Sequence, residues 1–233
     1  MTIAPIEIAD TTSFGPVFDE ALRLYCKANR PNSEFELARM AERLKETVLD
    51  REVFGWHYSR LLPNEIDNFR KFGARVSTKE RFLDRLGEAE VSGHLSSKIA
   101  KKIRDSSYFS GVDSPATRVG KFWMIGTRLD PVYRGVGDFL RYWGGEVARK
   151  NSNDLDSMRL LSSLGRPCII LLRVPISDIR YVDRIVRAMI DIRLGLGLSA
   201  LDPDFYIERD LPPEAILDVI DLNRETGSDV KKV

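Results

Sequence analysis

The stretch Trp56–Gly73, WHYSRLLPNEIDNFRKFG, changes its pattern halfway. Its aromatic and basic start extends a β-strand pattern that covers Val53–Arg60. Pro63 then suits the first turn of a helix, where a backbone N–H has no helical partner in any case. Apolar residues recur on one face up to Gly73, which fits a left-handed C-terminal cap. The stretch therefore predicts a strand that leads directly into a helix, with an aromatic and basic cluster at the junction.

The residues before this stretch predict helices. Ser33–Phe54 has apolar side chains at helical spacing, behind a Ser33 N-cap with Glu36 three residues later, as in a capping box. Val17–Ala28 repeats the pattern more briefly, and NRPN between the two is typical of a turn. We therefore expect a helical N-terminal segment over residues 1–52.

The residues after it alternate between helical and extended patterns. The expected helices cover Lys79–Phe109, Gly135–Lys150 and a segment that begins at Asp178. The expected strands cover Lys121–Leu129, Arg166–Ile176 and the start of Asp204–Leu222. The polar tail, residues 223–233, is expected to be flexible. This succession predicts an α/β or α+β chain, and we assign it to α+β.

Charge and cysteine content argue against several classes of protein and of binding site. With 36 basic and 35 acidic side chains the net charge is +1, so no global field attracts nucleic acid or an anionic membrane. The basic segment around Lys98–Arg104 is expected to be a solvated face, with RNA or DNA contact as the alternative. Cys26 and Cys168 belong to no metal-binding or disulfide pattern, so we interpret both as core residues. No apolar run approaches a membrane span, and a cytoplasmic location is expected.

Common catalytic motifs are missing from the sequence. There is no Gly-x-Ser-x-Gly elbow and no P-loop, and the only histidines are His57 and His94. The GLGLS run follows a helical pattern and lacks the Gly-x-Gly-x-x-Gly spacing of a dinucleotide fold. Metal binding by carboxylates alone stays open.

Three segments, in this order, resemble the ADP-ribosyltransferase-like fold. WHYSRLLPNEIDNFRKFGARVST (56–78) is similar to its opening, where an arginine or histidine on the first strand contacts NAD. GDFLRYWGGEVA (137–148) is similar to a Trp-Gly-Gly-Glu segment of bacterial and phage proteins of this type. DFYIERDLPPEAILDVI (204–220) is similar to its closing segment, where an acidic residue precedes an aromatic strand and a PPE-x-I turn. The resemblance covers roughly residues 53–222.

This resemblance implies a split β-sandwich catalytic domain over residues 53–222, behind the helical N-terminal segment. It implies NAD-dependent mono-ADP-ribosyl transfer to a macromolecular acceptor, protein or nucleic acid, by a toxin or phage–host conflict effector. An antitoxin or inhibitor protein would then be a partner. Two alternatives stay open: a catalytically silent module that keeps the fold for binding, and an NAD glycohydrolase with water as the acceptor.

The chemistry of NAD suggests which residues would bind it. The planar donors of Arg60 suit the pyrophosphate or ribose oxygens. Tyr58, Trp123 and Trp143 could sandwich the nicotinamide ring by offset stacking. Strand alternation places Tyr58 and Arg60 on one face, and His57, on the other, is the alternative contact to a ribose hydroxyl. Each also has an ordinary structural interpretation: Arg60 as an ion-pair partner, the tryptophans as core residues.

Three residues are candidates for the catalytic carboxylate. Transfer passes through a ribosyl cation, beside which a carboxylate must lie. The family pattern has a glutamate before the aromatic strand, whereas this chain has Asp204, which reaches one methylene less far. Glu208, four residues on, shares that strand face and ranks equally. Glu146 ranks next, as a residue that positions the ribose or the acceptor.

Overall fold

The computed structural model describes residues 4–28, 30–109, 118–149, 155–197 and 203–223. Helices and a six-stranded sheet in the order β4-β5-β2-β1-β3-β6 make up this part of the chain, which confirms the α+β class. The chain divides into two compact units. Unit 1 comprises residues 1–57, 123–129 and 171–208, and unit 2 comprises residues 58–122, 130–170 and 209–233. Residues 224–233 of the tail predicted to be flexible lie outside the described residues.

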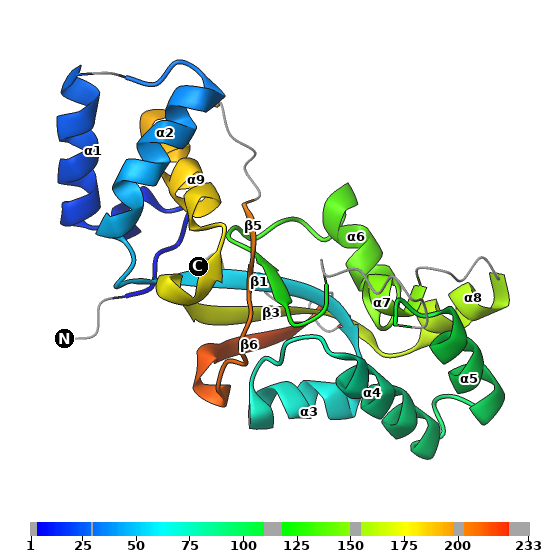
Figure 1. Ribbon diagram of the computed structural model, residues 1–233. Helices are drawn as coiled ribbons and strands as arrows, with labels where there is room; N and C mark the ends of the chain where they lie inside the picture. Colours follow the sequence, from blue (N-terminus) through cyan, green and yellow to red (C-terminus); the bar gives the residue numbers. More distant parts are fainter. Residues whose placement is uncertain (1–3, 29, 110–117, 150–154, 198–202, 224–233) are drawn as a thin grey trace. The chain divides into compact units, whose positions relative to one another are not determined.

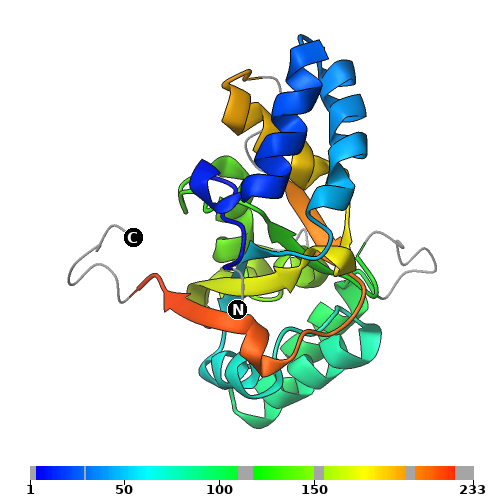
Figure 2. The same ribbon diagram turned by 90° about the vertical axis from the view of Figure 1, so that its left-hand side faces the viewer.

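The helices of unit 1 form one group. They are α1 (Pro16–Ala28), α2 (Glu34–Leu44) and α9 (Val182–Leu194), which lie side by side in Figures 1 and 2. Helix α2 packs against α9, and Leu37 and Met40 of α2 are fully buried, as are Ile185 and Met189 of α9. Burial of side chains of this size stabilises the group by about 1.5–3 kcal/mol each.

The predicted helix over Ser33–Phe54 is correct at its start and wrong at its end. The Ser33 hydroxyl caps the helix by accepting the N–H of Glu36, as expected. The helix, however, ends at Leu44 and continues as a 3₁₀ turn, Lys45–Thr47. There the Thr47 hydroxyl donates to the Leu44 carbonyl oxygen at 2.6 Å, and such local bonds compete with the helical ladder.

The three chain segments of unit 1 contribute to five strands. They are β4 (Ile179–Arg180), β5 (Asp204–Ile207), most of β2 (Phe122–Ile125), and parts of β1 (Glu52–Leu61) and β3 (Arg166–Pro175). β1 pairs antiparallel with β2, Trp56 opposite Ile125, and β4 pairs antiparallel with β5. Gly55 of β1 is needed for this packing, since a Cβ there would lie 2.7 Å from the Met124 sulfur.

Two predictions on unit 1 elements need correction. The strand over Lys121–Leu129 is shorter, because past β2 Gly126 turns away to donate its N–H to the Pro203 carbonyl. The helix expected from Asp178 begins only at Val182, because Ile179–Arg180 extends as β4 along β5. The strand expected over Arg166–Ile176 is confirmed as β3.

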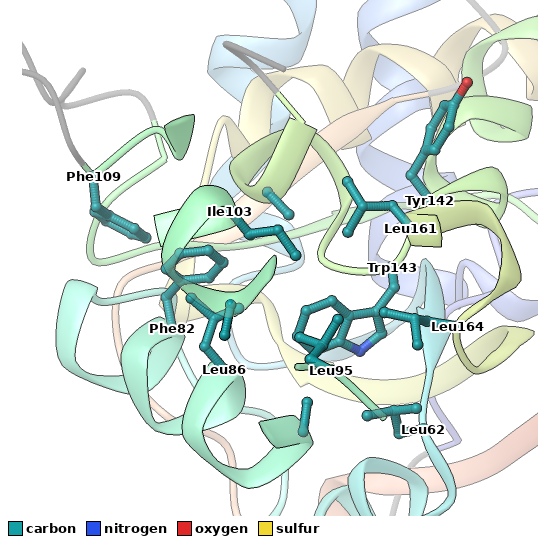
Figure 3. Close-up of a cluster of buried hydrophobic side chains, with 13 residues drawn as sticks. Leu62, Phe82, Leu86, Leu95, Ile103, Phe109, Tyr142, Trp143, Leu161 and Leu164 are labelled. Atoms are coloured by element: carbon teal, nitrogen blue, oxygen red, sulfur yellow. The ribbon is translucent and has the colours of Figure 1, made fainter. Parts of the chain in front are cut away.

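Unit 2 has a core of its own, and its described residues include six helices. They are α3 (Pro63–Phe72), α4 (Lys79–Val91), α5 (Ser97–Ser106), α6 (Arg134–Arg141), α7 (Gly145–Arg149) and α8 (Leu155–Ser163), with strand β6 (Ile216–Asp221). Figure 3 shows the indole of Trp143 in the middle of this core, beside Leu62, Leu95 and Leu164. Strand β1 and helix α3 confirm the strand-to-helix junction predicted around Pro63.

Two predictions on unit 2 are wrong in detail, and one helix was not predicted. The helix over Gly135–Lys150 is broken, because Gly144 and Gly145 adopt positive φ and the Trp143 N–H donates to Leu161 instead. The helix over Lys79–Phe109 is two helices, with a turn at 92–96 that contains Gly93 at φ 73°. Helix α8 has no counterpart in the prediction.

Gly73 ends α3 as predicted, but its cap is not left-handed helical. Its φ of 77° and ψ of −166° turn the chain so that Ala74 can pair with Leu211 in an antiparallel bridge. A Cβ at Gly73 would lie 2.0 Å from the Leu211 carbonyl oxygen. Only glycine therefore fits this close approach.

Candidate functional site

Three aromatic side chains of unit 1 form a cluster. The rings of Trp123 and Tyr206 have centroids 4.6 Å apart and a tilt of 46°. Tyr181 contacts Tyr206 edge to face at 5.3 Å and lies 6.3 Å from Trp123. We call these three residues the aromatic cluster. Tyr181 is 41% exposed, so the cluster has a side open to solvent.

Backbone pairing places these rings together. Tyr206 on β5 lies opposite Arg180 on β4, so the next residue, Tyr181, comes close to the Tyr206 ring. On β2, the carbonyl of Trp123 contacts His57 Nδ1 at 2.8 Å. Because a carbonyl oxygen can only accept, the His57 hydrogen lies on Nδ1. The contact joins β1 to the strand that carries the tryptophan.

Tyr181 has a strained backbone. Its φ of 69° and ψ of 39° are left-handed, and no other non-glycine residue in the described ranges has a positive φ. A bulky residue in this region costs of order 1–3 kcal/mol, and such strain concentrates at functional sites. Surrounding contacts offset it: the Arg184 guanidinium carbon lies 4.3 Å from the ring centroid, in a cation–π contact.

Two arginine–carboxylate pairs border the aromatic cluster. Asp204, at the start of β5, pairs with Arg184 of α9. Glu208, just past the end of β5, pairs with Arg180 of β4 at 2.8 Å. All four side chains are about half exposed. Pairs in such surroundings contribute only about 0–1 kcal/mol, so an anionic ligand could draw either arginine away from its carboxylate.

The predicted NAD contacts Tyr58, Arg60 and Trp143 belong to unit 2. Arg60 Nε donates to the Leu164 carbonyl at 2.5 Å and Nη1 to that of Leu140 at 3.4 Å. Burial lowers the pKa of Arg60. Arginine stays protonated even so, and these contacts spread its charge over two helix-terminal carbonyls.

Trp143 and Tyr58 are buried in unit 2. Trp143 is fully buried, and its indole N–H donates to Glu65 Oε2 at 2.8 Å. The Arg85 guanidinium lies over the same indole at 5.0 Å and pairs with Glu65 at 2.5 Å. Glu65 is therefore the ion-pair partner of Arg85, whereas the Arg60 guanidinium donates to backbone carbonyls. In this arrangement Trp143 has the contacts of a core residue.

The candidates thus fall in two groups. Unit 1 brings together His57, Trp123, Asp204 and Glu208. Unit 2 holds Tyr58, Arg60, Trp143 and Glu146, of which the Glu146 side chain lies outside the described residues. The convergence of Arg60 with a catalytic carboxylate remains a prediction.

Sequence reasoning missed four residues of the site: Arg180, Tyr181, Arg184 and Tyr206. A usable signal was the spacing Arg-Tyr-x-x-Arg at 180–184, within a segment interpreted only as helix. Tyr206 was visible as the aromatic residue midway between Asp204 and Glu208.

In the described ranges no three histidine, cysteine or acidic side chains are grouped as they would be to hold a metal ion. None of the helices in those ranges has the length and apolar character needed to span a bilayer. Comparison with protein-family models, with curated proteins and with solved structures found no match to this chain.

Proposed function

We propose that this protein is an NAD-dependent mono-ADP-ribosyltransferase with an ADP-ribosyltransferase-like fold, which modifies a macromolecular acceptor, protein or nucleic acid. The observation that carries the proposal is the aromatic cluster of unit 1, with a carboxylate at each end of its central strand. The open side of Tyr181 offers a surface for a planar ring, and Asp204 and Glu208 lie before and after Tyr206.

The reaction needs a ring-binding surface and a negative charge together. The bond between the nicotinamide nitrogen and ribose C1 breaks, and its electron pair leaves with nicotinamide. A carboxylate stabilises the ribosyl cation that develops, as in glycoside hydrolysis. The acceptor nucleophile then bonds to C1 and releases its proton to a base or to water.

Each carboxylate can be either paired with its arginine or released from it. While Glu208 is paired with Arg180, part of its charge is neutralised. The phosphates of a dinucleotide compete for the same guanidinium, because arginine binds carboxylate and phosphate with the same fork of donors. Substrate binding would thereby free the acid that acts on the cation. The same argument applies to Asp204 and Arg184.

The ion pairs also favour a second candidate, a catalytically silent binding module. If the arginines stay paired with their carboxylates when a ligand binds, no unpaired carboxylate is available to stabilise the ribosyl cation. The aromatic cluster would then bind a planar ring without chemistry.

NAD labelled in its adenylate part, incubated with the protein and cell lysate, tests these functions. The transferase should label protein or nucleic acid. The Glu208→Gln or Asp204→Asn variant, whichever residue is catalytic, should lose about 100-fold or more of this activity, as expected on removal of a transition-state charge contact. Glu20→Gln is the matched control, because Glu20 forms a similar exposed pair with Arg23 on α1. Nicotinamide release without labelling would indicate hydrolysis, and no NAD turnover at all would leave the binding module.

A further inference from the structure

An exposed aromatic ring in unit 2 lies between two cations. Phe72, the last residue of α3, is 41% exposed. The Lys71 ammonium lies 5.0 Å from its ring centroid, and the Arg75 guanidinium lies 4.7 Å from it. We call Lys71, Phe72 and Arg75 the basic aromatic patch. It belongs to the segment Arg70–Lys79, which has four basic side chains and no acidic one.

The backbone around the patch is held in place on both sides. Gly73 has no room for a Cβ beside Leu211, and Ala74 accepts the Leu211 N–H at 2.8 Å. Two residues further, the Val76 N–H donates to Asp210 at 2.9 Å. Arg75 therefore stands on a short loop whose ends are tied down. Presenting a ring and a cation in a fixed geometry lowers the entropy that binding must overcome.

The carboxylate that interacts with the patch, Asp210, is already paired with another arginine, and of the interactions that shift its pKa the charge of Arg75 has the smallest effect. Asp210, the nearby carboxylate, is bound at both oxygens by Arg81, each at 2.7 Å, and this hydrogen bonding lowers the pKa of Asp210. Neither Lys71 nor Arg75 forms an ion pair with a carboxylate in the ranges that the structure describes. The phosphates of a ligand could therefore bind Lys71 and Arg75, because the cation–π contacts of these two side chains with Phe72 leave their positive charge available.

Helix stability accounts for only part of this arrangement. Cations are favourable in the last turn of a helix, which suffices for Arg70 and Lys71. The dipole gives no reason for an exposed phenylalanine at the same end, or for Arg75 beyond it, over the phenylalanine ring. A ring with flanking cations is, however, what binding of an unpaired base next to its phosphates requires.

We propose that the basic aromatic patch binds single-stranded nucleic acid, with a base on the Phe72 ring and phosphates on Lys71 and Arg75. The net charge of the chain makes no such prediction; the local charge of unit 2 does. Double-stranded nucleic acid would bind more weakly, because its bases are stacked and their faces are covered.

Fluorescence anisotropy with labelled single strands of about ten nucleotides, RNA and DNA in separate arms, tests this binding. Phe72→Ala should weaken it about tenfold, the usual effect of losing one stacked base. Lys71→Ala with Arg75→Ala should reduce the slope of log K against log salt by about 1.4, since each phosphate contact on a single strand contributes about 0.7. A duplex of the same sequence should bind less tightly.

The chain offers a matched control for each variant. Phe35 on α2 is another exposed phenylalanine with an arginine, Arg39, over its ring at 5.9 Å. Phe35→Ala and the pair Arg39→Ala with Arg43→Ala remove the same chemistry from acidic surroundings, and should leave affinity and salt slope unchanged. Circular dichroism of every variant shows whether it is folded.

Three results would overturn the proposal. One is affinity unchanged by Phe72→Ala in a folded variant. Another is an equal loss in the Phe35 control. The third is binding to heparin or to phosphatidylserine vesicles that depends on Phe72 as much as oligonucleotide binding does, since neither has bases to stack. The assay contains no NAD, so its failure is distinct from a failure of the transferase proposal.

Discussion

Glu65 should be the most sensitive single carboxylate for the stability of unit 2. Its side chain is 7% exposed and accepts three donors: the Leu62 N–H at 2.7 Å, the Trp143 indole N–H at 2.8 Å and Arg85 Nε at 2.5 Å. The first bond begins α3, the second holds the central residue of the core, and the third joins α3 to α4. Glu65→Ala removes all three at once.

The loss of stability can be estimated from the acceptor that the three donors lose. Two buried N–H groups left without an acceptor cost about 1–3 kcal/mol each. Breaking a buried ion pair from one side costs about 3–5 kcal/mol in total, and Arg85 is one third exposed, which places the loss near the lower end. Because these two costs overlap in part, we expect Glu65→Ala to lower the free energy of unfolding by at least about 3 kcal/mol, a large part of the 5–15 kcal/mol typical of a folded protein.

Urea unfolding followed by far-ultraviolet circular dichroism measures this loss. Glu20→Ala is the control, since it removes a carboxylate from an ion pair that is 54% exposed on both sides and should change stability by less than about 1 kcal/mol. A double-mutant cycle of Glu65→Ala and Arg85→Ala should show a coupling well above the error, because the two side chains are in contact. A loss below about 1 kcal/mol in Glu65→Ala, equal to the control, would refute the reasoning.

Three further predictions concern other residues. Gly73→Ala should destabilise by more than about 2 kcal/mol in urea, because its Cβ would collide with the Leu211 carbonyl at positive φ; Gly87→Ala, in an open helical position, should instead stabilise by about 0.5–1 kcal/mol. Burial raises the pKa of the Cys168 thiol to about 11, so at about pH 8 a disulfide reagent should label Cys26 first and Cys168 only on unfolding; equal rates in the native protein would contradict this. Hydrogen bonding by Arg81 lowers the pKa of Asp210, so Asp210→Asn should cost up to about 1 kcal/mol at neutral pH, and the difference from the wild type should disappear as the pH falls through the folded pKa of that carboxyl.

Much of the secondary structure was predictable, because the patterns that specify it are local. A proline in the first turn and an apolar face define α3, and a continuous apolar run defines β3. The errors came where side chains or distant backbone compete for hydrogen bonds. Helix α2 ends ten residues early, and Trp143 leaves a helical pattern to donate its backbone N–H to Leu161.

The candidate site was predictable in part. Trp123, Asp204 and Glu208 were named from residue type and order, and unit 1 brings them together. Tyr181 was missed because nothing in the residues before it shows that Ile179–Arg180 would extend along β5 and force the next residue into a left-handed conformation. Trp143 was named as a ligand contact, whereas in the structure its indole contacts Glu65 and Arg85.

The amino-acid sequence alone determined the alternation of helices and strands, the strand-to-helix junction at Pro63 and the aromatic, acidic strand at 204–208, since each depends on neighbours within a few residues. Tertiary structure decided which rings meet and which charges are neutralised. Pairing of strands far apart in the chain places Tyr181, Tyr206 and Trp123 in one cluster. Binding of Asp210 by Arg81 leaves Lys71 and Arg75 as positive charge beside Phe72, because a carboxylate with both oxygens occupied by one arginine has little left to offer a second cation.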